Sequence, residues 1–259
     1  MFRSQESKSA PVGVVSKVLR ILETLDASPS GLQLRQIARE TNIHKSTAYR
    51  FLAHLEREGY LFRDEAGAYI VGPKLANLGA GVAYHATLRR VSRNAMQKIW
   101  KATQETVNLG VVDGLDVLYL DVIESAHLFR MGSLVGMRRP LNCTALGKAM
   151  LAYLPREQKE EMFSSLTFER LTAHTISNLP RFRKEIARIA QQGYAVDEQE
   201  TELGARCVAS PIFDASGRVA AAVSVSGPTT RITRAKVQPL AALLAKTLRE
   251  ISQRLESRA

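Results

Sequence analysis

Apolar residues in the first quarter of the chain recur three and four positions apart, which is the period of one helix face. This pattern predicts a first helix from about Val14 to Asp26 and a second in "LQLRQIARET", residues 32–41. The proline and glycine of "DASPSG" separate the two. The residues expected to face inward are Val15, Val18, Leu19, Leu22 and Leu25 in the first helix, and Leu34, Ile37, Ala38 and Thr41 in the second.

A third helix is predicted in "NIHKSTAYRFLAHLEREGYL", residues 42–61, ending at Gly59, a residue type common at helix C-termini. Two short apolar runs, 60–62 and 69–71, then flank the polar, glycine-containing "RDEAGA". Such an arrangement predicts a β-hairpin. The buried stripe of the third helix is expected to consist of Ala48, Phe51, Leu52 and Leu55.

The pattern is helical from Pro73 to about Thr106. It fits either one long helix or two helices in series with a hinge near "GAG" or "HAT". Beyond Thr106 the rhythm changes to strands alternating with helices, with an antiparallel finish. Strands are expected at 106–112, 116–123, 194–197, 206–213 and 219–227, with a weaker one at 127–133, and helices at 143–154, 181–193 and about 233–255.

Composition narrows the class of protein. The chain has 259 residues, 45% hydrophobic and 24% charged, as in a globular protein, and a net charge of +11. This excess of positive charge is compatible with binding to nucleic acid or to an acidic membrane surface, and also with the absence of any specific polyanionic partner. Much of it lies at residues 73–101, where Arg89, Arg90 and Arg93 either reach phosphates or form a solvated helix face.

Targeting signals and cysteine usage point to the cytoplasm. No apolar run approaches the ~18 residues of a membrane span, and the N-terminus lacks the apolar stretch of a secretory signal. We expect residues 1–11 to form a mobile tail. Cys143 and Cys207 are too few for a disulfide framework and match no zinc spacing, so a reducing compartment is expected.

Three short helices followed by a hairpin predict a winged helix-turn-helix, whose last helix enters the DNA major groove. Lys45, Ser46 and Thr47 would lie at the helix N-terminus, where free N–H groups favour a phosphate. Arg50, one turn later, is the candidate for a bidentate guanine contact, and Tyr49 for a phosphate or thymine methyl. The alternative is a plain helical unit with a solvated polar face.

The stretch "NCTALGKA", residues 142–149, resembles an anion site. Thr144 can cap the helix, which would leave the N–H groups of Ala145, Leu146 and Gly147 free to bind a carboxylate. Gly147 permits a close approach of backbone, and Lys148 after it is expected to face solvent. An ordinary capped helix is the alternative.

Two serines on the last strand form a second polar feature. Ser224 and Ser226 share one face because side chains alternate along a strand. They predict either a small polar concavity or a solvated strand end. Cys207 lies on a strand that could neighbour this one; alone, such a cysteine is more often a buried small hydrophobe.

Several motifs resemble those of the isocitrate-lyase-regulator (IclR) family of bacterial transcription factors over residues 12–256. They are "VSKVLRILETL", "LQLRQIARETNIHKSTAYRFLAHLEREGYL" and "YIVGPKL" in the first half, and "VGMRRPLNCTALGKAMLA", "GYAVDEQE" and "GARCVASPIFDASGRVAAAVSVSGP" in the second. The resemblance implies homodimers or dimers of dimers (tetramers) on palindromic double-stranded operators, and it leaves RNA polymerase open as a further partner.

The resemblance also implies an effector site for a small carboxylate. It places that site at Ala145, Leu146, Asp197, Cys207, Ser224 and Ser226, with Leu128 in its apolar wall. Asp197 would repel a carboxylate, so it accepts either from a ligand hydroxyl or from its own backbone. Asn142 and Cys143 stand where relatives often have His-Ala, a departure that leaves the effector's identity open.

The predicted fold class is α+β: an N-terminal winged helix-turn-helix (12–73), a linker helix region (74–105) and a GAF-like α/β effector-binding domain (106–259). The predicted function is a sequence-specific transcriptional regulator, a repressor of a catabolic operon controlled by a small organic acid. A thiol-based redox sensor using Cys143 and Cys207 is the alternative. Since the histidines have no triad spacing, we expect no enzymatic activity, and no cofactor or metal.

Overall fold

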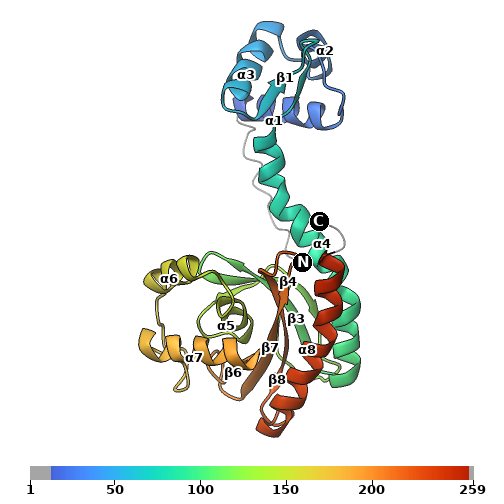
Figure 1. Cartoon of the computed structure of the whole chain (residues 1–259). Coiled ribbons are helices and arrows are strands. Elements are labelled where there is room, and N and C mark those ends of the chain that lie inside the picture. The colour runs from blue at the N-terminus through green and yellow to red at the C-terminus, as the bar shows by residue number, and fades with distance from the viewer. Residues whose placement is uncertain (1–12, 257–259) are drawn as a thin grey trace, which may run out of the picture. The chain divides into compact units, whose positions relative to one another are not determined.

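The structure, a computed structural model, describes residues 13–256 and divides into two compact units between Tyr84 and His85 (Figure 1). The tail predicted at residues 1–11 lies outside the described residues. The division falls within α4 (Pro73–Thr103), which is one uninterrupted helix of 31 residues, so the hinge left open does not split it into two. The predicted domain boundaries, after residues 73 and 105, lie on either side of this division.

The smaller unit is the predicted winged helix-turn-helix. It contains α1 (Gly13–Asp26), α2 (Leu34–Glu40), α3 (Lys45–Arg57), β1 (Leu61–Arg63) and β2 (Tyr69–Val71). The two strands pair antiparallel, with Leu61 opposite Val71, which confirms the hairpin. One apolar cluster joins the three helices to the hairpin; its fully buried members include Ile21, Leu25, Ile37, Ala48, Leu52, Leu61 and Tyr69.

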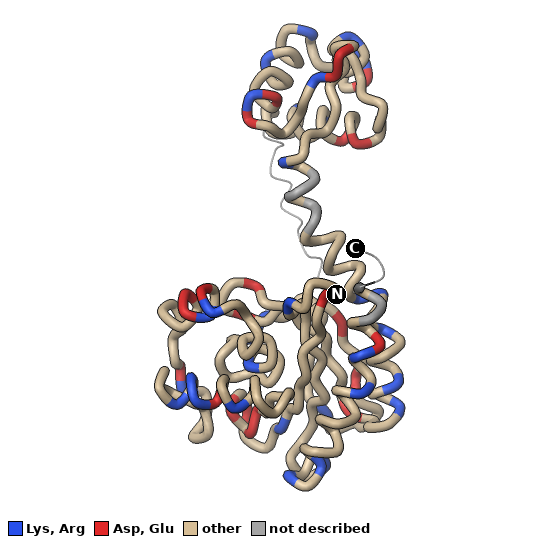
Figure 2. The backbone as a smooth tube through the Cα atoms, viewed as in Figure 1, with Lys and Arg blue, Asp and Glu red and all other residues tan. Residues whose placement is uncertain are grey.

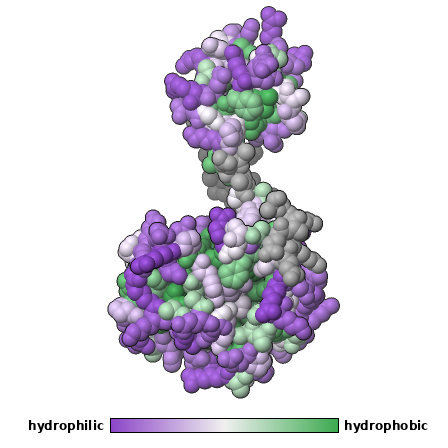
Figure 3. Space-filling model, in the orientation of Figure 1, coloured by the Kyte–Doolittle hydropathy of each residue, from purple (hydrophilic) through white to green (hydrophobic). Residues whose placement is uncertain are grey.

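The inward face predicted for α1 is partly wrong. Val15 and Leu19 are 54% and 52% exposed, whereas Ile21, which the prediction omitted, is fully buried. The buried stripe therefore runs through Ile21 and Leu25, turned around the helix from the predicted one, because α2, α3 and the hairpin pack on that side. The exposed side of α1 keeps an apolar row, and Figure 3 shows an apolar area on the visible face of this unit.

The larger unit is built on one six-stranded sheet in the order β5-β4-β3-β8-β7-β6, and every neighbouring pair is antiparallel. The chain therefore reaches β6 and β7 before it returns to insert β8 beside β3. The strands are β3 (Thr106–Asp113), β4 (Asp116–Ile123), β5 (Arg138–Pro140), β6 (Ala195–Glu198), β7 (Ala205–Phe213) and β8 (Val219–Pro228).

Helices cover both faces of this sheet (Figure 1). The second half of α4, from Leu88 on, and α8 (Arg234–Glu256) pack on one face. On the other face α5 (Ala145–Leu151) lies against the strands, with α6 (Arg156–Ser165) and α7 (Leu179–Gln192) outside it. The α7 helix is capped at its start by Asn178, whose side chain accepts a hydrogen bond from Arg181 N–H at 3.0 Å, and at its end by Gly193 in the left-handed region.

Two local predictions differ from the structure. Residues 127–133 form no strand; the strand that pairs with β4 on its outer side is β5, which begins at Arg138, opposite Leu118. The α6 helix was not predicted, although Pro155 followed by a run of good helix formers is a recognisable start. Its weak apolar periodicity explains the omission, since only Phe163 is buried.

Three of the six basic side chains in the segment at residues 73–101 are held by contacts within the protein itself. Arg93 contacts the buried Asp121 at 2.7 Å, Lys98 contacts Glu250 at 2.6 Å, and Lys74 donates to the carbonyl of Glu58 at 3.0 Å. Elsewhere, most Lys and Arg lie around the outside of both units, with Lys148 and Arg206 buried, and the central strands are drawn mostly in the neutral colour (Figure 2). These contacts favour the helix-face interpretation of Arg93 over a phosphate contact.

Candidate functional site

The α3 helix presents the face predicted to bind DNA. It begins at Lys45, so Lys45, Ser46 and Thr47 occupy its first turn, and no acidic residue lies there. Lys45, Ser46 and Arg50 are exposed, Thr47 is half-buried and Tyr49 is 51% exposed. Within residues 13–256, neither the Lys45 ammonium nor the Arg50 guanidinium makes a hydrogen bond or an ion pair. Both cations are therefore available to an external anion.

A cavity of about 580 Å³ opens on the face of the large sheet that α5 covers. It falls within the size range of small-molecule sites. Phe129, Met131, Leu171 and Leu203 supply apolar side chains to its wall. Of the residues predicted for an effector site, the cavity brings together Ala145, Leu146, Asp197, Cys207, Ser224 and Ser226.

Strand register places a row of polar side chains on the face of the sheet that bears the cavity, and three of the four, Asp197, Cys207 and Ser226, line it. Asp197 on β6 lies opposite Cys207 on β7, Cys207 opposite Ser226 on β8, and Ser226 opposite Thr106 on β3. Directly opposite residues point to the same face, so all four share the α5 side of the sheet. Ser224 and Ser226 are 2% and 5% exposed, which excludes the solvated strand end as an interpretation.

Asn108 is a participant that sequence reasoning missed. Its side-chain amide on β3 donates to Ser224 Oγ at 3.2 Å and to Ser226 Oγ at 3.1 Å, and Asn108 Oδ1 is buried with no partner in the described part of the chain. Both serine oxygens accept from the amide, and the two hydroxyls lie 3.4 Å apart, so one hydroxyl can donate to the other while the second hydroxyl hydrogen remains able to donate to a ligand. No local spacing signals this contact, since the partners lie 116 and 118 residues apart.

The Asp197 carboxylate accepts hydrogen bonds from the loop that follows β6. Its Oδ1 accepts the Glu200 N–H at 2.7 Å, and its Oδ2 accepts the Thr201 hydroxyl at 2.5 Å. Burial raises the pKa of the Asp197 carboxyl, while Lys148 and these donors oppose the rise. Of the two roles considered from sequence, the local one is therefore present. The carboxylate also lines the cavity, where it can still accept a hydrogen bond from a ligand hydroxyl.

The α5 helix is buried along its whole length. Thr144 caps it as predicted, accepting the Gly147 N–H at 3.1 Å, so that N–H is not free for a ligand. A Cβ at Gly147 would overlap the carbonyl of Leu141, so the predicted close backbone approach is present. The α5 residues that line the cavity are Ala145 and Leu146.

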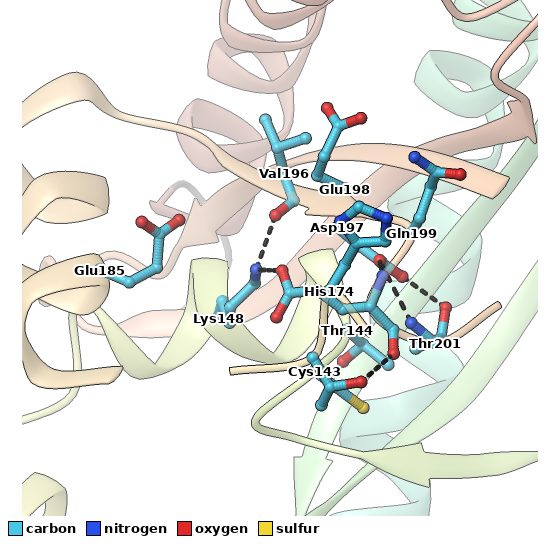
Figure 4. Close-up of polar contacts among 12 residues, drawn as sticks. Cys143, Thr144, Lys148, His174, Glu185, Val196, Asp197, Glu198, Gln199 and Thr201 are labelled. Carbon is cyan, nitrogen blue, oxygen red and sulfur yellow. Dashed lines mark hydrogen bonds and ion pairs between the residues drawn. The ribbon is translucent and has the colours of Figure 1, made fainter. Parts of the chain in front are cut away.

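Lys148 does not face solvent, contrary to expectation. Its side chain is fully buried, and Nζ donates to the Val196 carbonyl at 2.6 Å and pairs with Glu200 (Figure 4). Glu200 is 4% exposed, and its second oxygen has no partner within residues 13–256. The ion pair joins α5 to the loop after β6, the same loop that Asp197 organises at the cavity wall.

The prediction for Leu128 is wrong. Leu128 is 97% exposed and does not line the cavity, whereas its neighbour Phe129 does. The physical reason is that residues 127–133 form a loop without ladder pairing, so strand alternation does not fix which side chain faces inward. The loop is held instead by Arg231, which donates to the Phe129 carbonyl at 2.9 Å.

Both cysteines are free thiols of low reactivity. Burial raises the pKa of Cys143 to about 12, and removal from water likewise raises the pKa of Cys207 well above its usual range. Since the thiolate is the reactive form, neither group is primed for oxidation at neutral pH. The redox-sensor alternative finds no support in this chemistry.

Among residues 13–256, no group of three or more His, Cys, Asp or Glu side chains is arranged to hold a metal ion. In the same part of the chain, no helix combines the length and the apolar character that crossing a bilayer requires.

Comparison with known proteins identifies relatives over almost the whole chain. The family model described as "IclR helix-turn-helix domain" matches residues 14–65, and "Bacterial transcriptional regulator IclR C-terminal" matches residues 80–253. The HTH-type transcriptional regulator KdgR of Dickeya chrysanthemi is 35% identical over 245 residues, which cover 94% of this chain and 80% of that protein. The transcriptional repressor IclR of Escherichia coli is 27% identical over 241 residues, with coverages of 92% and 88%.

Solved structures of IclR proteins also match this chain. The IclR structure of Thermotoga maritima matches with a TM-score of 0.65 and 32% identity, covering 94% of this chain and 99% of that one. An IclR homolog from Microbacterium hydrocarbonoxydans, solved in complex with 4-hydroxybenzoate, matches with a TM-score of 0.63 and 25% identity, with the same coverages. The sequence relatives named above are transcriptional regulators rather than enzymes.

Proposed function

The chain belongs to the IclR family of bacterial transcriptional regulators, with an N-terminal helix-turn-helix domain and a C-terminal ligand-binding domain, and from this premise we propose that it is a repressor of a catabolic operon controlled by a small organic acid. The observation that carries the proposal is the convergence of polar side chains from separate strands on one cavity. Residues 12–73 would bind operator DNA, 74–105 link the domains, and 106–259 bind the effector.

The names of related proteins support repression and a small-molecule effector. One is the "Acetate operon repressor" of Salmonella typhimurium, 29% identical to this chain, and another is the E. coli repressor compared above. The Microbacterium homolog was crystallised with an aromatic hydroxy acid. For this chain we assign the effector contacts to Ala145, Leu146, Asp197, Cys207, Ser224 and Ser226.

In the DNA-binding domain, we assign Lys45, Ser46 and Thr47 to a phosphate at the start of α3, where the exposed N–H groups and the helix dipole favour an anion. Arg50, one turn further, reads a base edge in the major groove, and Tyr49 contacts backbone or a thymine methyl. A protein of this class binds a palindromic site as a homodimer or a dimer of dimers. The exposed apolar row of α1 supports a surface that a second copy covers.

Replacing Arg50 with alanine is expected to weaken operator binding about 5- to 150-fold, the range of a lost bidentate base contact. Effector affinity and the oligomeric state should not change, because Arg50 touches neither region. Fluorescence anisotropy with a labelled operator duplex measures the effect. Arg57→Ala, in the last turn of the same helix, is the matched control. Normal operator affinity for Arg50→Ala would remove Arg50 from the interface.

Control by an effector requires two arrangements of the DNA-binding domains that the effector binds with different affinity. A coupling free energy of ~1–3 kcal/mol would change operator affinity ~5- to 150-fold. A thermal-shift screen against organic acids tests the effector class, because a ligand that binds only the folded chain raises its melting temperature. The absence of any stabilising acid would contradict the proposed class of effector.

A further inference from the structure

The edge strand β5 carries two adjacent arginines that face opposite sides of the sheet. Arg139 lies opposite Val117 on β4, whose side chain is buried against α5, so Arg139 shares the face of the cavity and lines it. Arg138 points to the other side, where its guanidinium pairs with Asp113 at 2.7 Å. One of the two cations is therefore paired on the outside, and the other stands at the cavity.

Arg139 is exposed, and its guanidinium makes no hydrogen bond or ion pair with the side chains and backbone groups that the structure describes. The other cation of the lining, Arg130, is already paired with Glu124 at 2.8 Å. Beside Arg139 lies Tyr119, which also lines the cavity; burial raises the pKa of its phenol, and the charge of Arg139 opposes that rise. The phenol therefore stays protonated and able to donate next to an unpaired cation.

The opposite edge of the cavity has the reverse electrostatic character. Asp197 on the far edge strand β6 and Glu202 in the loop after it supply carboxylates to the lining. Between the two edges lie the serines of β8. A carboxylate ligand is repelled by the β6 edge and attracted by the β5 edge, whereas a ligand hydroxyl can donate to Asp197 or exchange hydrogen bonds with the serines.

We propose that Arg139, assisted by the Tyr119 hydroxyl, holds the acidic group of the effector, so that the effector lies across the sheet with its hydroxyl end at Ser224 and Ser226. This inference rests on the proposed function and deepens it, since it moves the acid group from the N-terminus of α5 to the β5 edge. Three strand spacings separate β5 from β8, roughly 14 Å between strand axes. An acid of two or three carbons is too short to contact both Arg139 on β5 and the serines on β8. The proposed effector class is therefore a longer hydroxy acid.

The test uses ω-hydroxy acids from glycolate to 8-hydroxyoctanoate together with 4-hydroxybenzoate, each paired with its primary amide, in calorimetry with the full chain. The wild type should bind the longer acids more tightly than glycolate and more tightly than their amides. Arg139→Gln should weaken acid binding about 10- to 150-fold, the value of a charge-assisted hydrogen bond, and leave amide binding unchanged. Arg138→Gln removes the same charge from the outer face and should keep the preference for acids.

The outcomes separate this inference from the function it rests on. If Arg139→Gln binds acids as tightly as the wild type, the acid group lies elsewhere, at Ala145 and Leu146, and the inference is overturned while the acid effector stands. If glycolate binds as well as the longer acids, the orientation across the sheet is wrong. If the wild type binds no acid of the series, the proposed effector class fails, and this inference fails with it.

Discussion

Replacing Lys148 with alanine should lower the free energy of unfolding by about 3–5 kcal/mol, the cost of removing one partner of a buried ion pair. The change leaves the Glu200 carboxylate without its cation in a place that water does not reach, and it removes the donor to the Val196 carbonyl. Urea unfolding followed by circular dichroism measures the loss. The loop after β6, which the Asp197 carboxylate organises, should loosen, and effector affinity should fall with it.

A control variant and the pH dependence show whether the unpaired Glu200 carboxylate causes the loss of stability in Lys148→Ala. Lys184→Ala, at an exposed position of α7, should change stability by no more than about 0.5 kcal/mol. Burial raises the pKa of Glu200, and loss of Lys148 raises it further. The deficit of Lys148→Ala is therefore present above that pKa and shrinks as the pH falls through it, because protonation removes the unpaired charge. A loss below 1 kcal/mol at neutral pH would contradict the importance of the pair.

The double substitution Ser224→Ala, Ser226→Ala is expected to weaken effector binding about 30-fold or more and to abolish the effector response while operator binding persists. Each serine offers the cavity a hydroxyl, and two lost hydrogen bonds of ~1 kcal/mol or more account for that factor. Calorimetry with the acid that most stabilises the wild type measures affinity, and anisotropy with the operator duplex measures DNA binding.

Ser210→Ala provides the matched control for the serine pair. Ser210 lies on β7 and is as buried as Ser224, but it lies opposite Val223 and therefore faces away from the cavity. Its loss should leave effector affinity unchanged. If the double variant binds the effector like the wild type, Ser224 and Ser226 are not part of the binding site.

Local periodicity was sufficient to predict most helices and strands. The three short helices, the hairpin, the serine strand and the Thr144 cap each depend on residues within a few positions of one another. Prediction failed where packing partners decide the outcome. The buried side of α1 is chosen by α2, α3 and the hairpin, and an unpaired loop gave no alternation to place Leu128.

In the candidate site, too, features set by local sequence were predictable, and features set by distant partners were not. Ser224 and Ser226 could be placed on one face from strand alternation, and the motif resemblance led to four more residues that line the cavity, Ala145, Leu146, Asp197 and Cys207. Asn108, Lys148 and Arg139 could not be assigned, because their roles depend on strand order and on partners distant in the sequence. Lys148 meets Glu200 across 52 residues, and Arg139 faces the cavity only because β5 pairs with β4 in one register.

The central claim is that one chain joins sequence-specific DNA binding to an acid-controlled switch. The most direct test selects a duplex from a random library with the purified full-length chain and then titrates that duplex with and without the stabilising acid. The account predicts a preferred palindromic duplex whose affinity changes ~5- to 150-fold when the acid is present. Equal binding of selected and random duplexes at modest salt, with or without acids, would contradict it.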